Sequence, residues 1–480
     1  MEVLFVASEV APYSKTGGLG DVAGALPRAL AARGHTVAVV TPRYGSIDPV
    51  KHGLEPLHRA VRVRGEGTTA WLKRGKVPVY FIEHERHFGS RRGLYSEPGR
   101  DYEDNAERFA FFARAALALL HGVKLRPQIV HVNDWQTGLV PWILKREHAG
   151  DPLLQGVRSV FTIHNLSYQG VFPKEVLPRI GLPWEIFRFD AAEFHDRLNF
   201  MKAGIAFGDA LTTVSPTYAR EILTPQAGWG LDGLLRQRAR DLTGILNGVD
   251  VDEWDPAHDP HLPVHYSARR PVGKGACKAA LQRELGLPVR DDVPLVGMVG
   301  RLVDQKGLDL VVPSLTEILG MEVQVAVLGT GRPDFEEAFA RAAAARPDRI
   351  AARIGFDERT AHRIEAGADV FLMPSQFEPC GLNQLYSLRY GTVPVVRAVG
   401  GLEDTVEDYD GWRRGTGFKF REYEARAMLT ALRRAVETWR DARAWRGIVE
   451  RGMAQDFSWG RSAERYEALY AGLAGSVRSR

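Results

Sequence analysis

Two cations, Arg301 and Lys306, lie in the run GRLVDQKG, between an apolar strand pattern at 295–299 and the start of a helical pattern. A guanidinium can bind two phosphate oxygens at once, and an ammonium adds a point charge. The start of a helix also offers N–H groups to an anion. Because both charges stand beside glycines at the end of a strand, we predict a diphosphate-binding loop here rather than a solvated surface pair.

A carboxylate, Glu378, follows the strand pattern at 370–373 in the run FEPCGL. At that position it can accept hydrogen bonds from sugar hydroxyls, and the following helix start favours its ionised form. A helix-capping glutamate is the alternative. Cys380 beside it has no neighbour in sequence that would activate a thiolate. The run GGL at 400–402 repeats a glycine-rich helix start, which we expect to approach a phosphate.

A similar run, SKTGGLGD at 14–21, joins the strand pattern 3–7 to apolar residues at helical spacing. Glycines there suit a phosphate-binding loop with Lys15 adding charge, but a plain strand-to-helix turn is equally compatible. Pro27 lies within the helical pattern and predicts a kink or restart.

Polar residues follow three further strand patterns of the first half. Asp134 follows 128–132, His164 and Asn165 follow 159–163, and Ser215 follows 210–214. Open α/β sheets bind ligands at this edge, so the repetition predicts a site although each residue alone has a structural explanation. Three aromatic side chains are candidates for stacking on a sugar, with ordinary packing as the alternative: Tyr95, Trp135 and Tyr168.

Strand patterns alternate with helical ones along the chain, which is typical of parallel α/β sheets. A turn-rich connector follows residue 245, and a second series then begins with strands at 295–299, 323–328, 350–354, 370–373 and 393–396. We therefore predict two doubly wound domains joined near residue 245. The segment 44–105 is harder to interpret, and we expect 89–100 to be a mobile loop. The helices after 457–459 can pack on either domain.

Bulk properties exclude several classes of protein. The 480 residues are 45% hydrophobic and 25% charged, and the net charge of +4 is small, which disfavours a nucleic-acid binder. Cys277 and Cys380 have no metal or disulfide-scaffold spacing, so we expect a reducing cytoplasm. The first apolar run is interpreted as a strand rather than a signal peptide, and no run is long enough to span a membrane. Metal motifs, Walker loops and nucleophile elbows are missing, which argues against metal-dependent or serine-hydrolase chemistry.

Six runs in order and spacing resemble the bacterial and plant-type glycogen (starch) synthases that use ADP-glucose, over essentially the whole chain. They are KTGGLGD, HVNDWQ, TIHNLSYQG, GILNGVD, GRLVDQKG and PSQFEPCGLNQLY. The resemblance implies a GT-B fold, with two Rossmann-like domains facing a deep interdomain cleft. Residues 1–243, completed by a C-terminal helix at 460–480, would bind the glucan acceptor, and 244–459 would bind the nucleotide sugar.

The family transfers glucose from ADP-glucose to the 4-hydroxyl of an α-1,4-glucan with retention of configuration, without metal or cofactor. By this resemblance the catalytic residues are Glu378, Arg301, Lys306 and His164. The substrate-binding residues are Lys15, Gly18, Asp134, Tyr95, Asn165, Asn247, Cys380, Gly381 and Gly401. Related retaining enzymes often have a second glutamate where this chain has Tyr386, so a two-glutamate mechanism is not expected. No carboxylate pair like that of glycosidases is evident either, which favours front-face attack.

Three alternatives stay open at this point. The chain could transfer glucose from UDP-glucose, act as a sucrose- or trehalose-type synthase, or bind glucans without catalysis. The diphosphate-binding residues argue against a pure binding protein. A hinge near Asn247 would let the two domains close on a substrate.

Overall fold

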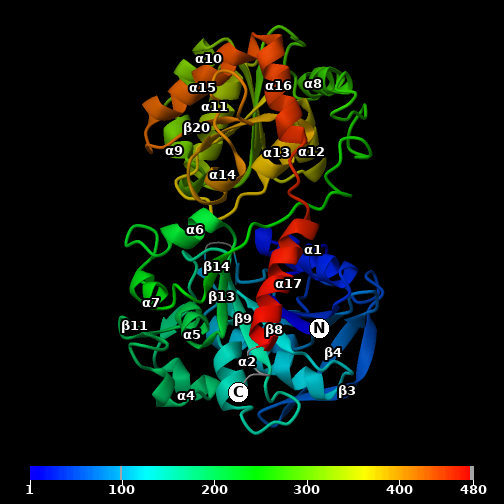
Figure 1. Ribbon diagram of the computed structural model, residues 1–480, viewed down its shortest axis with the longest axis vertical. Helices are drawn as coiled ribbons and strands as arrows, with labels where there is room; N and C mark the ends of the chain where they lie inside the picture. The colour runs from blue at the N-terminus through cyan, green and yellow to red at the C-terminus, as the bar shows by residue number, and fades with distance from the viewer. Residues whose placement is uncertain (98–99, 476–480) are drawn as a thin grey trace. The chain divides into compact units, whose positions relative to one another are not determined.

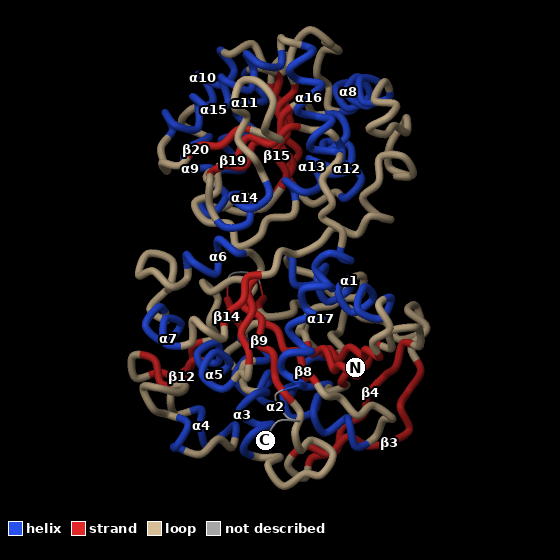
Figure 2. Tube along the Cα trace, viewed as in Figure 1, coloured by secondary structure: helices blue, strands red, loops and turns tan. Residues whose placement is uncertain are grey.

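The computed structural model describes residues 1–97 and 100–475, with the side chains of 58–60 left aside. The chain forms two compact units, Met1–Gly248 with Trp459–Arg480, and Val249–Ser458. The division falls after Gly248 rather than after residue 243, because the chain leaves the first sheet only after its edge strand at Leu242–Gly244. Of the predicted helix 460–480, residues 476–480 lie outside the described residues. Each unit is α/β, as predicted (Figure 1, Figure 2).

The first unit is built on a sheet with strand order β14-β13-β9-β8-β1-β2-β5-β4-β3. From β14 to β5 neighbouring strands are parallel, and β4 and β3 add an antiparallel edge. The strands of this sheet are β1 (Glu2–Val6), β2 (Thr36–Pro42), β3 (Glu55–Val63), β4 (Glu66–Lys73), β5 (Val79–Ile82), β8 (Ile129–Asn133), β9 (Arg158–Ile163), β13 (Ala210–Thr213) and β14 (Leu242–Gly244). Short strands outside it are β6 (Ser96–Glu97), β7 (Arg100–Asp101), β10 (Val171–Pro173), β11 (Glu193–Phe194) and β12 (Arg197–Asn199).

Helices of the first unit follow its strands. They are α1 (Gly18–Ala32), α2 (Asn105–Ala118), α3 (Val140–Arg146), α4 (Val176–Ile180), α5 (Phe200–Phe207), α6 (Pro216–Glu221), α7 (Asp232–Gln237) and α17 (Trp459–Gly475), with short turns η1 (Glu85–Gly89), η2 (Leu119–His121), η3 (Trp135–Thr137) and η4 (Trp184–Ile186). The restart predicted at Pro27 is wrong, because α1 runs unbroken through it. Burial of the apolar face around Leu26 and Leu30 outweighs the one N–H donor that a proline lacks.

Like the short strands β10, β11 and β12, the hairpin β3–β4 is an element that the sequence patterns did not show. Arg64 and Gly65 connect its strands, and both have positive φ, 50° and 86°. Such a two-residue turn matches the twist of a hairpin, but it usually carries Asn-Gly rather than Arg-Gly. Within the predicted loop 89–100, β6 pairs with β7, and residues 98–99 lie outside the described residues. Its mobility stays a prediction.

The last helix, α17, belongs to the first unit and lies along α1 (Figure 1). Arg33 at the end of α1 pairs with Glu464 at 3.2 Å and Glu467 at 2.6 Å. The Tyr470 hydroxyl lies 2.6 Å from Nδ1 of His131 in β8. The chain therefore returns to its first unit after completing the second.

The second unit has a parallel sheet with strand order β17-β16-β15-β18-β19-β20. Its strands are β15 (Leu295–Val299), β16 (Gln324–Gly329), β17 (Ile350–Ile354), β18 (Val370–Met373), β19 (Val393–Arg397) and β20 (Phe418–Phe420). Its helices are α8 (Gly273–Glu284), α9 (Leu308–Val311), α10 (Leu315–Gly320), α11 (Pro333–Ala345), α12 (Glu358–Gly367), α13 (Asn383–Tyr390), α14 (Gly400–Thr405), α15 (Ala425–Trp439) and α16 (Ala442–Met453), with the turn η5 (Asp304–Lys306). Continuous apolar strands such as β15 and β18 are buried by helices on both faces, as a parallel sheet requires.

Each sheet has a point where the strand order reverses. In the first unit it lies between β1 and β8, and in the second between β15 and β18. Ligands of open α/β sheets bind beyond the carboxyl ends of the strands at such points. The predicted site residues are therefore located relative to these two positions.

Candidate active site

The reversal point of the second unit carries an ion pair. Lys306 follows β15 and Glu378 follows β18, and their side chains meet with Nζ 2.6 Å from Oε2. Ser375 donates a second hydrogen bond to the same oxygen at 3.0 Å. Glu378 is 5% exposed, whereas the Lys306 side chain is 27% exposed. The buried carboxylate thus fixes a lysine whose side chain is partly exposed to solvent.

Glycines bring the loops of this site together. A Cβ on Gly307 would lie 2.1 Å from the carbonyl oxygen of Pro374, and one on Gly401 would lie 2.0 Å from that of Cys380. Gly307 also has φ of +75°. The N–H of Gly401 donates to the carbonyl of Glu378 at 3.1 Å. Backbone packing therefore explains the glycine at 401, and its N–H donates within the protein. The approach of the run 400–402 to a phosphate stays a prediction.

The other predicted residues of this half lie in the same loops. Arg301 is exposed and donates to Oε1 of Gln305 at 3.2 Å, while the Gln305 amide donates to the carbonyl of Phe377 at 3.3 Å. Cys380 is buried, and Gly381 has φ of +73°. The structure thus gathers six of the predicted residues in the segments that follow β15 and β18 and at the start of α14: Arg301, Lys306, Glu378, Cys380, Gly381 and Gly401.

Tyr386 has a packing role in α13. Its ring stacks on Trp254, with ring centroids 3.7 Å apart and planes within 3°. The position where related retaining enzymes often carry a second glutamate thus holds an aromatic stack in this chain.

At the reversal point of the first unit the central group is Glu9, just beyond β1. One oxygen of its carboxylate accepts the N–H groups of Thr16 at 2.5 Å and Gly17 at 3.3 Å. The other accepts the hydroxyls of Thr16 at 2.6 Å and Tyr95 at 2.7 Å. The chain's own carboxylate therefore occupies two N–H groups just before α1, those of Thr16 and Gly17. Phosphate binding by the first N–H groups of α1 itself stays a prediction.

Lys15 and Gly18 lie on the outside of this loop. Lys15 pairs with Asp21 at 2.6 Å, and its side chain is 49% exposed. Gly18 is the exposed first residue of α1. Both are accessible to a ligand, and neither takes part in the hydrogen bonds around Glu9.

Asp134, beyond β8, has a strained backbone. Its φ of 55° and ψ of −177° fall in a region used almost only by glycine. Its Oδ1 accepts the N–H of His164 at 2.7 Å. Burial raises the pKa of Asp134 to about 7, against the lowering effect of N–H donors from His164 and Asn165, and the charge of Glu9 adds to the rise. The carboxyl group therefore changes charge near neutral pH.

His164 is a neutral imidazole in this environment. Its Nε2 lies 2.9 Å from Oδ1 of Asn133, whose amide nitrogen donates to the carbonyl of Val6 at 3.0 Å. This amide orientation makes Nε2 the N–H donor and leaves the lone pair on Nδ1. Burial lowers the pKa of His164 to about 3, so the ring is uncharged at neutral pH.

The other predicted residues of the first unit differ in their surroundings. The amide oxygen of Asn165 accepts the N–H and hydroxyl of Ser167, at 3.0 and 2.7 Å, and shapes the loop. Trp135 is buried and packs on Phe109, so packing explains it. Asn247 follows β14, and its buried Oδ1 has no hydrogen-bond partner within residues 1–97 and 100–475.

Sequence reasoning missed Glu9, Asn133 and Ser375. Glu9 follows the strand pattern 3–7 as Asp134 follows 128–132, so the rule that selected Asp134 also selects Glu9. Asn133 directly follows the predicted strand 128–132, and only the structure shows that it ends β8 and that its amide orients His164.

Comparisons with known proteins find matches to both halves of the chain. Residues 2–237 match the starch synthase catalytic domain family, and residues 286–448 match glycosyl transferases group 1. Glycogen synthase of Anaeromyxobacter sp. (strain Fw109-5) is 73% identical over 474 residues, which cover 99% of this chain and 100% of that protein. Glycogen synthase of Myxococcus xanthus (strain DK1622) is 49% identical, with coverage of 98% and 99%.

Two solved structures of synthases are also similar to this chain over nearly its full length. The catalytic domain of starch synthase IV from Arabidopsis thaliana, bound to ADP and acarbose, has a TM-score of 0.90 and 36% identity, covering 98% of this chain and 99% of that one. Sucrose-phosphate synthase from Thermosynechococcus elongatus, at 20% identity and a TM-score of 0.62 over 99% of both chains, shares the fold.

Two Rossmann-like domains with these family matches define a glycosyltransferase of the GT-B fold, as predicted. Within that class, the chain belongs to the glycogen synthase family. No helix in the described ranges combines the length and apolarity that crossing a bilayer requires.

Proposed function

We propose that the protein transfers glucose from ADP-glucose to the non-reducing 4-hydroxyl of an α-1,4-glucan, with retention of configuration and release of ADP, in the cytoplasm. The observation that carries this proposal is the Lys306–Glu378 pair at the reversal point of the second sheet. It places a cation that can bind a phosphate beside a carboxylate that can accept hydrogen bonds from sugar hydroxyls. A nucleotide sugar carries both of these ligand groups. The relative from Arabidopsis thaliana, whose structure holds ADP and acarbose, supports this choice of ligands.

In the second unit, Arg301 and Lys306 neutralise the diphosphate, which stabilises ADP as the leaving group. Glu378 accepts hydrogen bonds from glucose hydroxyls, and its bonds from Lys306 and Ser375 hold it in one rotamer. Cys380, Gly381 and Gly401 form the backbone beside the donor.

In the first unit, His164 presents the lone pair of Nδ1 to a sugar hydroxyl. Its low pKa keeps it a neutral acceptor through the physiological range. Tyr95, Asp134, Asn165 and Asn247 contribute to the glucan side. Lys15 and Gly18 contact the donor during turnover.

The bond changes are simple. The bond from glucose C1 to the diphosphate oxygen breaks, and a bond from C1 to the acceptor O4 forms on the same face. The acceptor proton passes to the departing diphosphate oxygen, so no protein base is needed. Positioning and charge stabilisation by the two cations then supply most of the rate enhancement.

One assay separates this function from its alternatives. ADP-glucose and UDP-glucose are each offered with glycogen, with fructose 6-phosphate or glucose 6-phosphate, or without acceptor. We expect elongation of glycogen from ADP-glucose. Elongation from UDP-glucose alone would change the donor, product only with the small sugars would indicate another synthase, and no transfer in any arm would leave a glucan-binding protein.

A further inference from the structure

His362, within α12, holds a buried nitrogen that the proposed reaction does not use. The side chain is 1% exposed, and its Nδ1 lies 2.8 Å from Oδ2 of buried Asp259. Asp259 also accepts the Tyr390 hydroxyl at 2.6 Å and the N–H of His261 at 2.8 Å. Oδ2 of Asp259 is thus an acceptor, which makes Nδ1 of His362 the donor.

The other nitrogen of this ring, Nε2, is sealed from solvent and has no hydrogen-bond partner in the described part of the chain. Such an atom is costly in a folded protein unless a ligand satisfies it. The ring cannot turn over without losing the hydrogen bond from Nδ1 to Asp259, and Trp254 stacks on its face with centroids 3.8 Å apart and planes within 12°. The direction of the unsatisfied nitrogen is therefore fixed.

Two exposed carboxylates reach the same point. Glu358 precedes His362 by one turn of α12, and Glu253 comes from the turn before Trp254. An oxygen of each and a ring nitrogen of His362 all lie within 4.8 Å of one another. Since Nδ1 is committed to Asp259, Nε2 is the nitrogen left to bind a ligand.

The turn that carries Glu253 is anchored on both sides. Arg389 of α13 donates to the carbonyls of Val251, at 3.1 Å, and Trp254. The Trp254 ring is held between His362 and Tyr386. The turn that carries the third potential ligand is thus held against α12 and α13.

We propose that Glu253, Glu358 and His362 bind a first-row divalent cation of the zinc type, with solvent completing the coordination. One imidazole nitrogen with carboxylate oxygens is a ligand set that zinc accepts. The hydrogen bond from His362 to Asp259 is the outer-shell contact that orients metal-binding histidines. The cation ties the first turn of the second unit to α12 and takes no part in glucosyl transfer.

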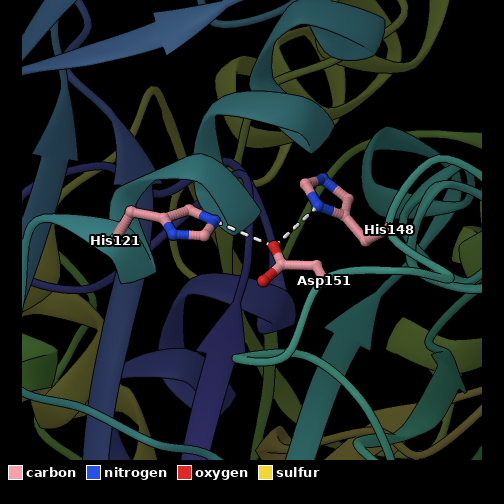
Figure 3. Close-up of side chains that lie close together, drawn as sticks. All are labelled: His121, His148 and Asp151. Carbon is pink, nitrogen blue, oxygen red and sulfur yellow. Dashed lines mark hydrogen bonds and ion pairs between the residues drawn. The ribbon is translucent and has the colours of Figure 1, made fainter.

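A second group of potential ligands, His121, His148 and Asp151, provides a control (Figure 3). Both rings point at one oxygen of Asp151, at 2.9 and 3.2 Å from His121 Nε2 and His148 Nδ1. In this group the facing atoms already satisfy one another, so it has no counterpart of the unsatisfied Nε2.

The test uses the full chain, freed of metal with a chelator and titrated with ZnCl2 by calorimetry. We expect one Zn²⁺ equivalent whose affinity falls about tenfold or more in Glu358→Gln and in Glu253→Gln, and is retained in His121→Gln. Because both glutamates are exposed, these variants keep the core around His362 intact, which circular dichroism checks.

Binding that is lost only in His121→Gln would place the cation in the second group and overturn the proposal. Absence of Zn²⁺ binding to the unsubstituted chain would overturn it as well, and would leave a water molecule as the partner of Nε2. Unchanged Zn²⁺ affinity in both glutamate variants would also overturn the proposal.

Discussion

The two sheet reversal points have the same topology but opposite chemistry. In the first unit, Glu9 and Asp134 follow the central strands, and an uncharged His164 lies beside them. In the second, Lys306 and Glu378 occupy the corresponding places. The first site is rich in acceptors suited to hydroxyl groups, whereas the second carries the cation that a diphosphate requires.

The glycine-rich helix starts differ in the same way. At α1, the N–H groups of Thr16 and Gly17 go to Glu9, and a Cβ on Gly17 would meet nothing within 4 Å. At α14, Gly401 is required by contact with the Cys380 carbonyl. Similar glycine-rich runs therefore form a carboxylate-bound loop in one unit and a closely packed helix start in the other. Neither run alone indicates a phosphate.

The largest effect is expected from Asp134→Asn in the first unit. The pKa of Asp134 is about 7 in the folded chain against 3.8 when unfolded, so the folded state retains a proton that the unfolded state has released. The free energy of unfolding should therefore fall by about 4 kcal/mol as pH rises from 4 to 8, and the substitution should remove this fall. Denaturant unfolding of both proteins across this range measures it. Parallel stability curves would show that Asp134 is an ordinary carboxylate.

In the second unit, Lys306→Ala should lower turnover by two to three orders of magnitude, about 2.7–4 kcal/mol in the barrier, because a preorganised charge stabiliser is lost. Lys419→Ala is the matched control, since Lys419 forms a comparable pair with Glu403 at 2.7 Å away from the reversal point. Initial rates with saturating ADP-glucose and glycogen give the comparison. Equal rates in the two variants would remove the assigned role of Lys306.

Substitution of the two glycines tests the contrast between the helix starts. Gly401→Ala should destabilise the chain by about 1–3 kcal/mol, because its Cβ would overlap the Cys380 carbonyl. Gly17→Ala should cost less than about 1 kcal/mol, since its extended backbone, φ −161°, suits any residue and the space is open. Thermal unfolding measures both, and a reversed order would contradict the packing explanation.

The smallest effect is expected from Lys15→Ala, which should raise the KM for ADP-glucose several-fold and leave the unfolding temperature unchanged. Its ion pair with Asp21 is half-exposed and contributes about 1 kcal/mol or less to stability. Asp21→Asn, which keeps the lysine, is the control and should retain the original KM. A KM unaffected by Lys15→Ala would exclude the donor contact.

Much of the fold could be predicted because its parallel strands are continuous apolar runs. β8, β9, β15 and β18 match the predicted strands within a residue or so at each end. The β3–β4 hairpin was not predicted, because its strands are polar and its Arg-Gly turn is an uncommon one. The continuity of α1 through Pro27 was not predicted, because the effect of this proline depends on tertiary burial rather than on local preference.

The positions of the candidate site residues could be predicted from the sequence better than the contacts that orient them. The rule that polar side chains follow parallel strands located Asp134, His164, Lys306 and Glu378. It could not show the strained φ of Asp134, or the amide of Asn133 that selects the tautomer of His164. These depend on contacts between segments far apart in sequence, as does the stack of Trp254 on His362.

The central claim is that the second unit, and not the acceptor-rich first one, binds the diphosphate. Calorimetric titration of ADP into the full chain tests it directly, with Lys306→Ala and Glu9→Gln as the paired variants. We predict that Lys306→Ala weakens ADP binding about tenfold or more, whereas Glu9→Gln leaves it near the original value. ADP affinity that depends on Glu9 and not on Lys306 would contradict the account.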